Sequence, residues 1–163
     1  MDLTGLNLPP SVVERVQFTP FDDLLLAIFD RGLPDLDFRL TLPEKMPFPV
    51  VTANRFPRGN LGWAGDPRFI DNGSFKVNVF TTGVNADIEG QFISEAIRVM
   101  LFQAHTERWH FPGLGSILKI QMLVEPNDQD DWATSTGVVQ YADLPKGVAR
   151  AESIYDMTIR RPT

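Results

Sequence analysis

The sequence predicts an α+β fold in which two principal helices pack on a mainly antiparallel sheet within a single domain. Helical spacing of apolar residues occurs in only two segments, whereas several shorter segments alternate apolar and polar residues. Two helices are too few to cover both faces of a parallel sheet, so antiparallel pairing is expected. At 163 residues the chain has the length of one domain.

The first helix is predicted from about Pro20 to Arg31, after an extended lead-in over residues 1–18. Thr19 is a suitable N-cap, and Pro20 is favoured at the first helical position. Gly32 is expected to end the helix in the left-handed backbone conformation. The apolar residues of this segment repeat at helical spacing: Phe21, Leu25, Ile28 and Phe29.

Two strands are predicted next, over Phe38–Leu42 and Phe48–Arg55, because apolar and polar residues alternate in both. Pro47 and Pro49 place the start of the second strand at a sheet edge or outside the ladder, since proline cannot donate a ladder hydrogen bond.

A long glycine-rich loop is expected over residues 58–72. Asn72-Gly73 is a strong turn signal, and it predicts a hairpin between Phe69–Ile70 and Phe75–Val79.

The segment from Ser74 to Ala104 is predicted to be the centre of the fold. Its first half is a strand that alternates with period two, and its second half is the longest helix. We expect the apolar stripe of this helix to face the sheet. The stripe consists of Ile88, Phe92, Ala96 and Val99, widened by Ile93, Ile97 and Met100.

The remaining elements are a strand over Ile117–Val124, an acidic loop over residues 125–137 and a closing strand over residues 150–160. The strands alternate apolar and polar residues, whereas the loop is rich in aspartate.

Charge and composition exclude several classes of protein. With a net charge of −6, the chain lacks the excess of basic residues that binding to a nucleic-acid backbone requires. Without cysteine there is no disulfide framework, thiolate zinc site or cysteine nucleophile. The first residues have no basic or apolar region of a signal peptide, and no segment is long and apolar enough to span a membrane.

Candidate chemistry is sparse. His105 and His110 lie five positions apart, without a cysteine or third histidine to complete a tetrahedral zinc site. Asp128, Asp130 and Asp131 resemble a calcium loop, but the central glycine and the distal glutamate are missing. We therefore expect no metal, cofactor or catalytic residue. The alternative is a small cytosolic metal- or ligand-binding enzyme that uses the two histidines and Asp128–Asp131.

Two loops are candidate contact surfaces. Arginines around the glycine-rich loop could meet an acidic partner, and exposed apolar side chains in that loop are unfavourable in water unless a partner covers them. The acidic loop could form a negatively charged lip; the alternative for both loops is a solvated surface. The candidate interface residues are Arg55, Arg58, Leu61, Trp63, Arg68, Asp128, Asp130, Asp131 and Trp132.

The order of these elements resembles a known family over about residues 15–161. The segments that carry the resemblance are Phe48-Pro-Val-Val-Thr-Ala-Asn-Arg55, Phe75-Lys-Val-Asn-Val-Phe80 with the helix after it, and Ile154-Tyr-Asp-Met-Thr-Ile-Arg160. They are similar to the tail terminator proteins of long-tailed bacteriophages, also called tail-completion or minor tail proteins. The lead-in up to Thr19 has no counterpart in that family.

The resemblance implies an α+β structural protein of the virion, assembled in the host cytoplasm, and neither an enzyme nor a cofactor-binding protein. It implies a homo-oligomeric ring, a hexamer, at the head-proximal end of the tail tube. Such a ring stops tube polymerisation and contacts the major tail tube protein and the head–tail connector, while DNA only passes through its lumen. The loops 58–72 and 125–137 would join neighbouring subunits. Another neck or head-completion connector protein is the alternative within the same class.

Overall fold

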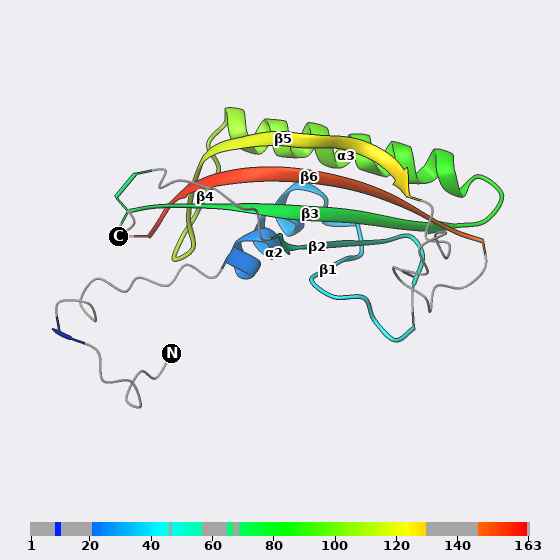
Figure 1. Cartoon of the computed structure of the whole chain (residues 1–163), viewed down its shortest axis with the longest axis horizontal. Helices are drawn as coiled ribbons and strands as arrows, with labels where there is room; N and C mark the ends of the chain where they lie inside the picture. The colour runs from blue at the N-terminus through cyan, green and yellow to red at the C-terminus, as the bar shows by residue number, and fades with distance from the viewer. Residues whose placement is uncertain are drawn as a thin grey trace, which may run out of the picture.

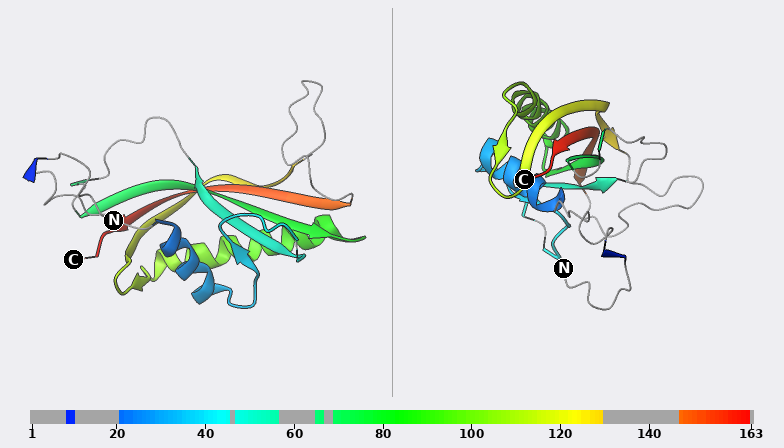
Figure 2. Two further views of the ribbon diagram at one scale, coloured as in Figure 1. Left: turned by 90° about the horizontal axis from the view of Figure 1, so that it is seen from below. Right: turned by 90° about the vertical axis from the view of Figure 1, so that its left-hand side faces the viewer.

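A computed structural model describes residues 9–10, 21–45, 47–56, 65–66, 69–129 and 147–162. In these residues a six-stranded sheet of order β1-β2-β3-β6-β5-β4 carries both long helices, α2 and α3, on one of its faces (Figures 1 and 2). All neighbouring strands are antiparallel except β1 and β2. The predicted α+β fold, a mainly antiparallel sheet with two principal helices, is therefore confirmed.

Helix α2 spans Phe21–Gly32, close to its predicted bounds, and all four of its predicted apolar residues are buried. Thr19 and Pro20, the predicted helix start, lie outside the described residues. The prediction for Gly32 was wrong, because its φ is not positive. A Cβ at Gly32 would lie 2.3 Å from Met100 Cγ and 3.2 Å from Trp109 Cη2, so glycine is required there for close packing on α3.

Of the two strands after α2, the first is shorter than predicted and the second is shifted toward the C-terminus. Strand β1 contains only Phe38–Arg39, and β2 spans Val50–Phe56 and begins after a cis bond between Phe48 and Pro49. The Phe38 ring stacks on Phe29 of α2 with 3.9 Å between centroids, which fixes this edge of the sheet against the helix.

The centre of the sheet is the pair β3 (Ile70–Thr82) and β6 (Val148–Arg160), which remain paired over their whole length. The hairpin predicted at Asn72-Gly73 was wrong, because both residues lie inside β3. Gly73 is buried beneath Phe21, and a Cβ there would lie 3.0 Å from that ring. The glycine thus allows the close approach of α2, not a reversal of the chain.

Strand β5 spans Gly115–Gln129 and also extends past its predicted end. Residues 125–129, predicted to begin the acidic loop, continue the strand, since Asn127, Asp128 and Gln129 pair with β6. Strand β4, His110–Phe111, pairs with the first residues of β5, its one partner among the described strands. The rest of the acidic loop lies outside the described residues.

Helix α3, Ala86–Thr106, lies across β5, β6 and β3 and completes the helical layer. The connector after it folds back on α2: Trp109 is buried, and the Arg31 guanidinium lies 4.3 Å from the centre of its ring. Among the helices of the described chain, none is long and apolar enough to cross a membrane.

Candidate interaction surface

Helix α3 has apolar residues on two sides, and only one side is covered by the sheet. Its buried side is built largely from small residues, Ala86, Gly90, Ser94 and Ala104, together with Ile97, Met100 and Leu101. The opposite side exposes Ile88 by 70%, Phe92 by 77%, Val99 by 53% and Phe102 by 67%. These four residues are called the α3 stripe below.

The predicted core face of this helix was therefore partly wrong. Ile97 and Met100 are buried as expected, and Ile93 and Ala96 are half-buried. Ile88, Phe92 and Val99, expected at the sheet, point away from it, because the small residues of the buried side allow the helix backbone to approach the strands closely. Gly90 illustrates this: a Cβ there would lie 3.3 Å from Thr81 Oγ1 of β3.

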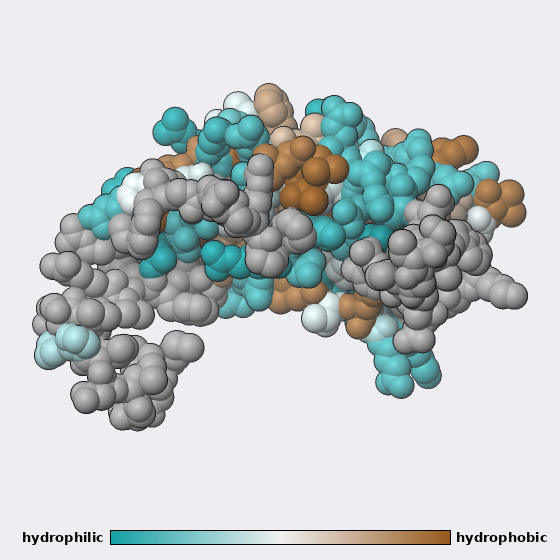
Figure 3. Space-filling model, viewed as in Figure 1, coloured by the Kyte–Doolittle hydropathy of each residue, from teal (hydrophilic) through white to brown (hydrophobic). Residues whose placement is uncertain are grey.

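The α3 stripe is large for a surface that stays in water. With roughly 150–250 Å² for an aromatic side chain and somewhat less for an aliphatic one, the four exposed fractions amount to on the order of 500 Å². The largest apolar patch of a typical monomer is about 300–600 Å², and it often has a function. In the space-filling view, apolar side chains interrupt the polar surface along the rim where α3 runs (Figure 3).

An apolar groove of about 400 Å³ extends this surface toward α2. One wall is the turn after α2, with Leu33, Pro34 and Leu36, and the other wall is α3, with Phe92, Ile93 and Ala96. Phe92 thus belongs both to the stripe and to the rim of the groove.

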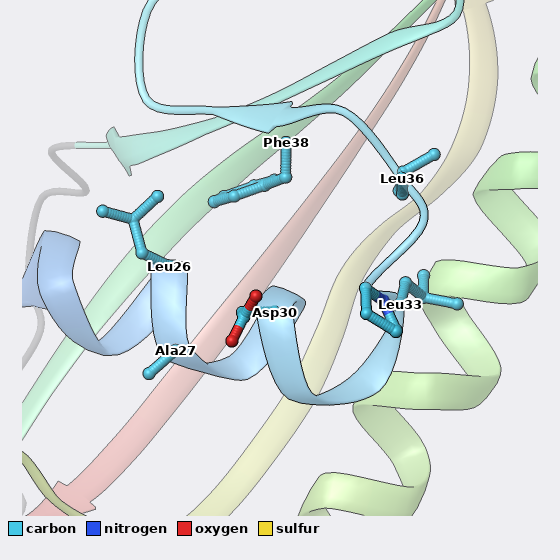
Figure 4. A pocket seen from close by; sticks show the side chains of 7 residues that line it. Leu26, Ala27, Asp30, Leu33, Leu36 and Phe38 are labelled. Carbon is cyan, nitrogen blue, oxygen red and sulfur yellow. The ribbon is translucent and has the colours of Figure 1, made fainter.

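A second concavity of about 370 Å³ lies on the other side of the same turn, between α2 and β1. Figure 4 shows Leu26, Leu33, Leu36 and Phe38 around it, with the Asp30 carboxylate as the charged group of the lining.

One ion pair interrupts the α3 stripe. Arg98 Nε donates to Glu95 Oε2 at 2.7 Å, and the two side chains are 44% and 55% exposed. This hydrogen bond lowers the pKa of Glu95 and raises that of Arg98, so both groups are charged at neutral pH. An exposed pair of this kind contributes little to the stability of the subunit, because water and salt screen the attraction between the two charges.

The face of the sheet away from the helices contains a charged network. Arg150, whose side chain is 2% exposed, donates to Asn78 Oδ1 at 2.9 Å and to Glu152 Oε2 at 2.8 Å. Lys76 Nζ lies 3.1 Å from the same glutamate oxygen. A buried arginine needs such partners to compensate for the loss of water around its charge. The network therefore has a structural role.

Two of the predicted interface residues are described, and both interact within the chain. The Arg55 guanidinium lies 5.2 Å from the centre of the Phe21 ring, and its Nη2 contacts Asn72 O at 3.5 Å. Asp128 Oδ2 accepts from Gln91 Nε2 of α3 at 3.2 Å. The other predicted interface residues lie outside the described residues: Arg58, Leu61, Trp63, Arg68, Asp130, Asp131 and Trp132.

The residues of the alternative enzyme site are not brought together where the structure describes them. His105 Nδ1 accepts from the Ile120 N–H at 3.2 Å, and His110 Nδ1 lies 2.8 Å from Ser116 Oγ. Asp128 contacts α3 at Gln91, about 21 Å along the helix from His105 at 1.5 Å per residue. The described residues contain no group of three or more histidine, aspartate or glutamate side chains that could hold a metal ion.

Comparisons with known proteins add little. No protein-family model matches this chain, and no curated protein matches it. One solved protein structure aligns with 83% of this chain and 94% of its own chain, at 16% sequence identity and a TM-score of 0.41. A similarity this low indicates neither a shared fold nor a shared function.

Proposed function

We propose that this chain is a structural virion protein of the tail-terminator type. Its copies would form a ring at the head-proximal end of a phage tail tube, stop tube polymerisation and present a surface to the head–tail connector. The support is the family resemblance of the sequence together with the α3 stripe.

The α3 stripe is the observation that carries this proposal. A helix packed on a sheet normally has a polar outer side, because an exposed apolar side chain gains nothing from water. Here the outer side has two phenylalanines, an isoleucine and a valine. A protein that assembles with copies of itself removes such a surface from water in the assembled state.

The surface is also of a suitable size for a subunit contact. A stable interface buries about 800 Å² on each partner, and the α3 stripe alone provides on the order of 500 Å². The groove along Leu33, Pro34 and Leu36 adjoins the stripe at Phe92 and enlarges the available area. The helical face as a whole can therefore form one side of a subunit interface.

The test is polymerisation of tail tube subunits in the presence of this protein, followed by negative-stain electron microscopy. We expect short tubes with a ring at one end. Phe102→Asp should abolish the effect by placing a charge in the stripe, whereas Gln103→Asp, at the adjacent exposed position, should leave it intact.

Three outcomes would contradict the proposal or one of its parts. Tubes of unchanged length with wild-type protein would exclude a terminator, and self-association without any effect on tubes would favour the connector alternative. Equal activity of Phe102→Asp and wild type would show that the α3 stripe is not the subunit contact.

A further inference from the structure

The α3 stripe is nearly symmetric about its centre. Apolar residues stand at 88 and 92 on one side and at 99 and 102 on the other, with Glu95 between them. These positions follow the alternating spacing of three and four residues that is typical of a helix packing against another helix. Turned end for end, the stripe presents much the same surface.

The charges in the centre of the stripe are self-complementary. If two α3 helices pack antiparallel about a two-fold axis near residue 96 or 97, Glu95 of one copy approaches Arg98 of the other, and the reverse holds by symmetry. Each exposed ion pair then becomes part of a group of four alternating charges. The parallel arrangement would instead place each charge beside its like.

We propose that two copies of the free protein bind each other through their α3 stripes, antiparallel and about a two-fold axis. Phe92 of one copy packs on the Val99–Phe102 segment of the other, and Ile88 packs near its far end. The consequence for assembly rests on the proposed function: the dimer covers the surface that the ring uses, so each copy must leave the dimer before it joins a ring.

Pairing through sheet edges is the competing mode, and β5 is protected against it. Among the described strands, only the short β4 lies beyond β5. The remaining edge has three register shifts, a proline at position 126, and a backbone N–H at Ile120 that donates to His105. Bulges and proline are features that block edge-to-edge pairing.

The size of the contact fits a dimer that dissociates. Two stripes bury on the order of 1,000 Å² in total, which is at the low end for specific complexes, where transient ones are found. A subunit that has to exchange one partner for another requires a contact of this class.

Cysteine cross-linking tests the arrangement directly, because the natural chain contains no cysteine. In the antiparallel pair, the two copies of residue 99 lie about 7.5 Å apart along the helix axis, and those of residue 106 about 28 Å apart. A short thiol–thiol cross-linker should therefore trap Val99→Cys as a dimer, on the order of tenfold faster than Thr106→Cys. Equal cross-linking of both variants, or of neither, would overturn the proposal.

Charge reversal provides a second measurement that a different orientation would not reproduce. Glu95→Arg should shift the free protein toward monomer in sedimentation velocity, and Glu95→Arg combined with Arg98→Glu should restore the dimer. A double variant that is no more dimeric than Glu95→Arg would contradict the antiparallel contact.

Tail tube experiments separate this inference from the proposed function. The Val99→Cys dimer, once cross-linked, should not shorten tubes, whereas wild-type protein treated with the same cross-linker, which finds no cysteine to react with, should. If wild-type protein dimerises as described but never affects tubes, only the proposed function fails. If it is monomeric at every concentration yet shortens tubes, only the dimer fails.

Discussion

At the scale of single residues, Gly32 shows how closely the two helices pack. It ends α2 directly above Met100 of α3, and a Cβ would lie 2.3 Å from Met100 Cγ and 2.7 Å from its sulfur. Its backbone has no positive φ, so alanine would be compatible with the local conformation. The contact with Met100, and a looser one at 3.2 Å with Trp109, oppose the substitution.

Gly32→Ala should therefore lower the free energy of unfolding by about 1–3 kcal/mol, as overpacking of a core does. Without the contact, a glycine-to-alanine change would be neutral or stabilising by reducing the entropy of the unfolded chain. Urea unfolding gives the measurement, and Gly32→Ala in a Met100→Ala background is the control. If the loss is the same in both backgrounds, Met100 is not the cause.

Tyr155 is a second residue whose surroundings lead to a prediction. Its ring is buried against Phe75, with 5.5 Å between centroids, and burial raises the pKa of its hydroxyl above the ordinary value of 10.0. Above that value the tyrosine of the unfolded chain loses its proton, while the tyrosine of the folded chain keeps it. The contribution to stability is complete below about pH 10 and is lost as the pH rises toward the folded pKa.

The free energy of unfolding of wild type relative to Tyr155→Phe should thus fall above about pH 10, with a limiting slope of about 1.4 kcal/mol per pH unit. Phenylalanine keeps the ring, and the difference between the two proteins cancels the titration of other groups. Parallel pH profiles of both proteins would show that Tyr155 ionises equally in the folded and unfolded states.

At the scale of elements, α3 separates folding from association. Its buried side stabilises the subunit, whereas the α3 stripe contributes little to the isolated chain. Ile97→Ala should lower the free energy of unfolding by about 2–5 kcal/mol, because Ile97 is fully buried. Phe92→Ala should change it by less than about 0.5 kcal/mol, because that side chain is 77% exposed.

Urea unfolding at high dilution, where copies are separate, distinguishes the two sides of α3. A loss for Phe92→Ala as large as that for Ile97→Ala would mean that the stripe packs within its own subunit.

Local pattern predicted the helices well and their orientation less well. In α2 the large apolar residues other than Leu26 lie on one side, so their spacing identified both the helix and its buried face. In α3 large apolar residues lie on both sides of the helix, and the buried side also holds the small residues Gly90 and Ser94. A single sequence does not distinguish an apolar stripe that packs on the core from one that binds a partner.

The errors in the strands have a different physical origin. Asn72-Gly73 has the local chemistry of a turn, but pairing with β6 on one side and the approach of Phe21 on the other hold it in an extended strand. Residues 125–129 likewise resemble a loop until their pairing with β6 is known. Such contacts join segments that are far apart in the chain, so the local β-strand or turn propensity of a segment does not predict them.

At the scale of the whole molecule, the two faces of the sheet differ in character. The helical face has the α3 stripe and the apolar groove beside the turn after α2. The other face has the paired charges of Lys76, Arg150 and Glu152. A subunit with one apolar face is suited to contact a copy of itself through that face.

The candidate surface could be predicted only in part. The sequence predicts a subunit that assembles through contacts in its loops. Arg55, one of those candidates, stacks on Phe21 within the chain, whereas Phe102, absent from the candidates, is part of the stripe. The sequence did contain a signal for this surface, because α3 has more apolar residues than one buried side of a helix can hold.

Sedimentation equilibrium over a range of concentrations tests most directly the claim that the α3 stripe binds a second copy. Wild-type protein and Gln103→Asp should associate as concentration rises, and Phe102→Asp should remain monomeric at every concentration while unfolding like wild type in urea. A wild-type protein that stays monomeric throughout, or a Phe102→Asp variant that associates as strongly as wild type, would contradict the account.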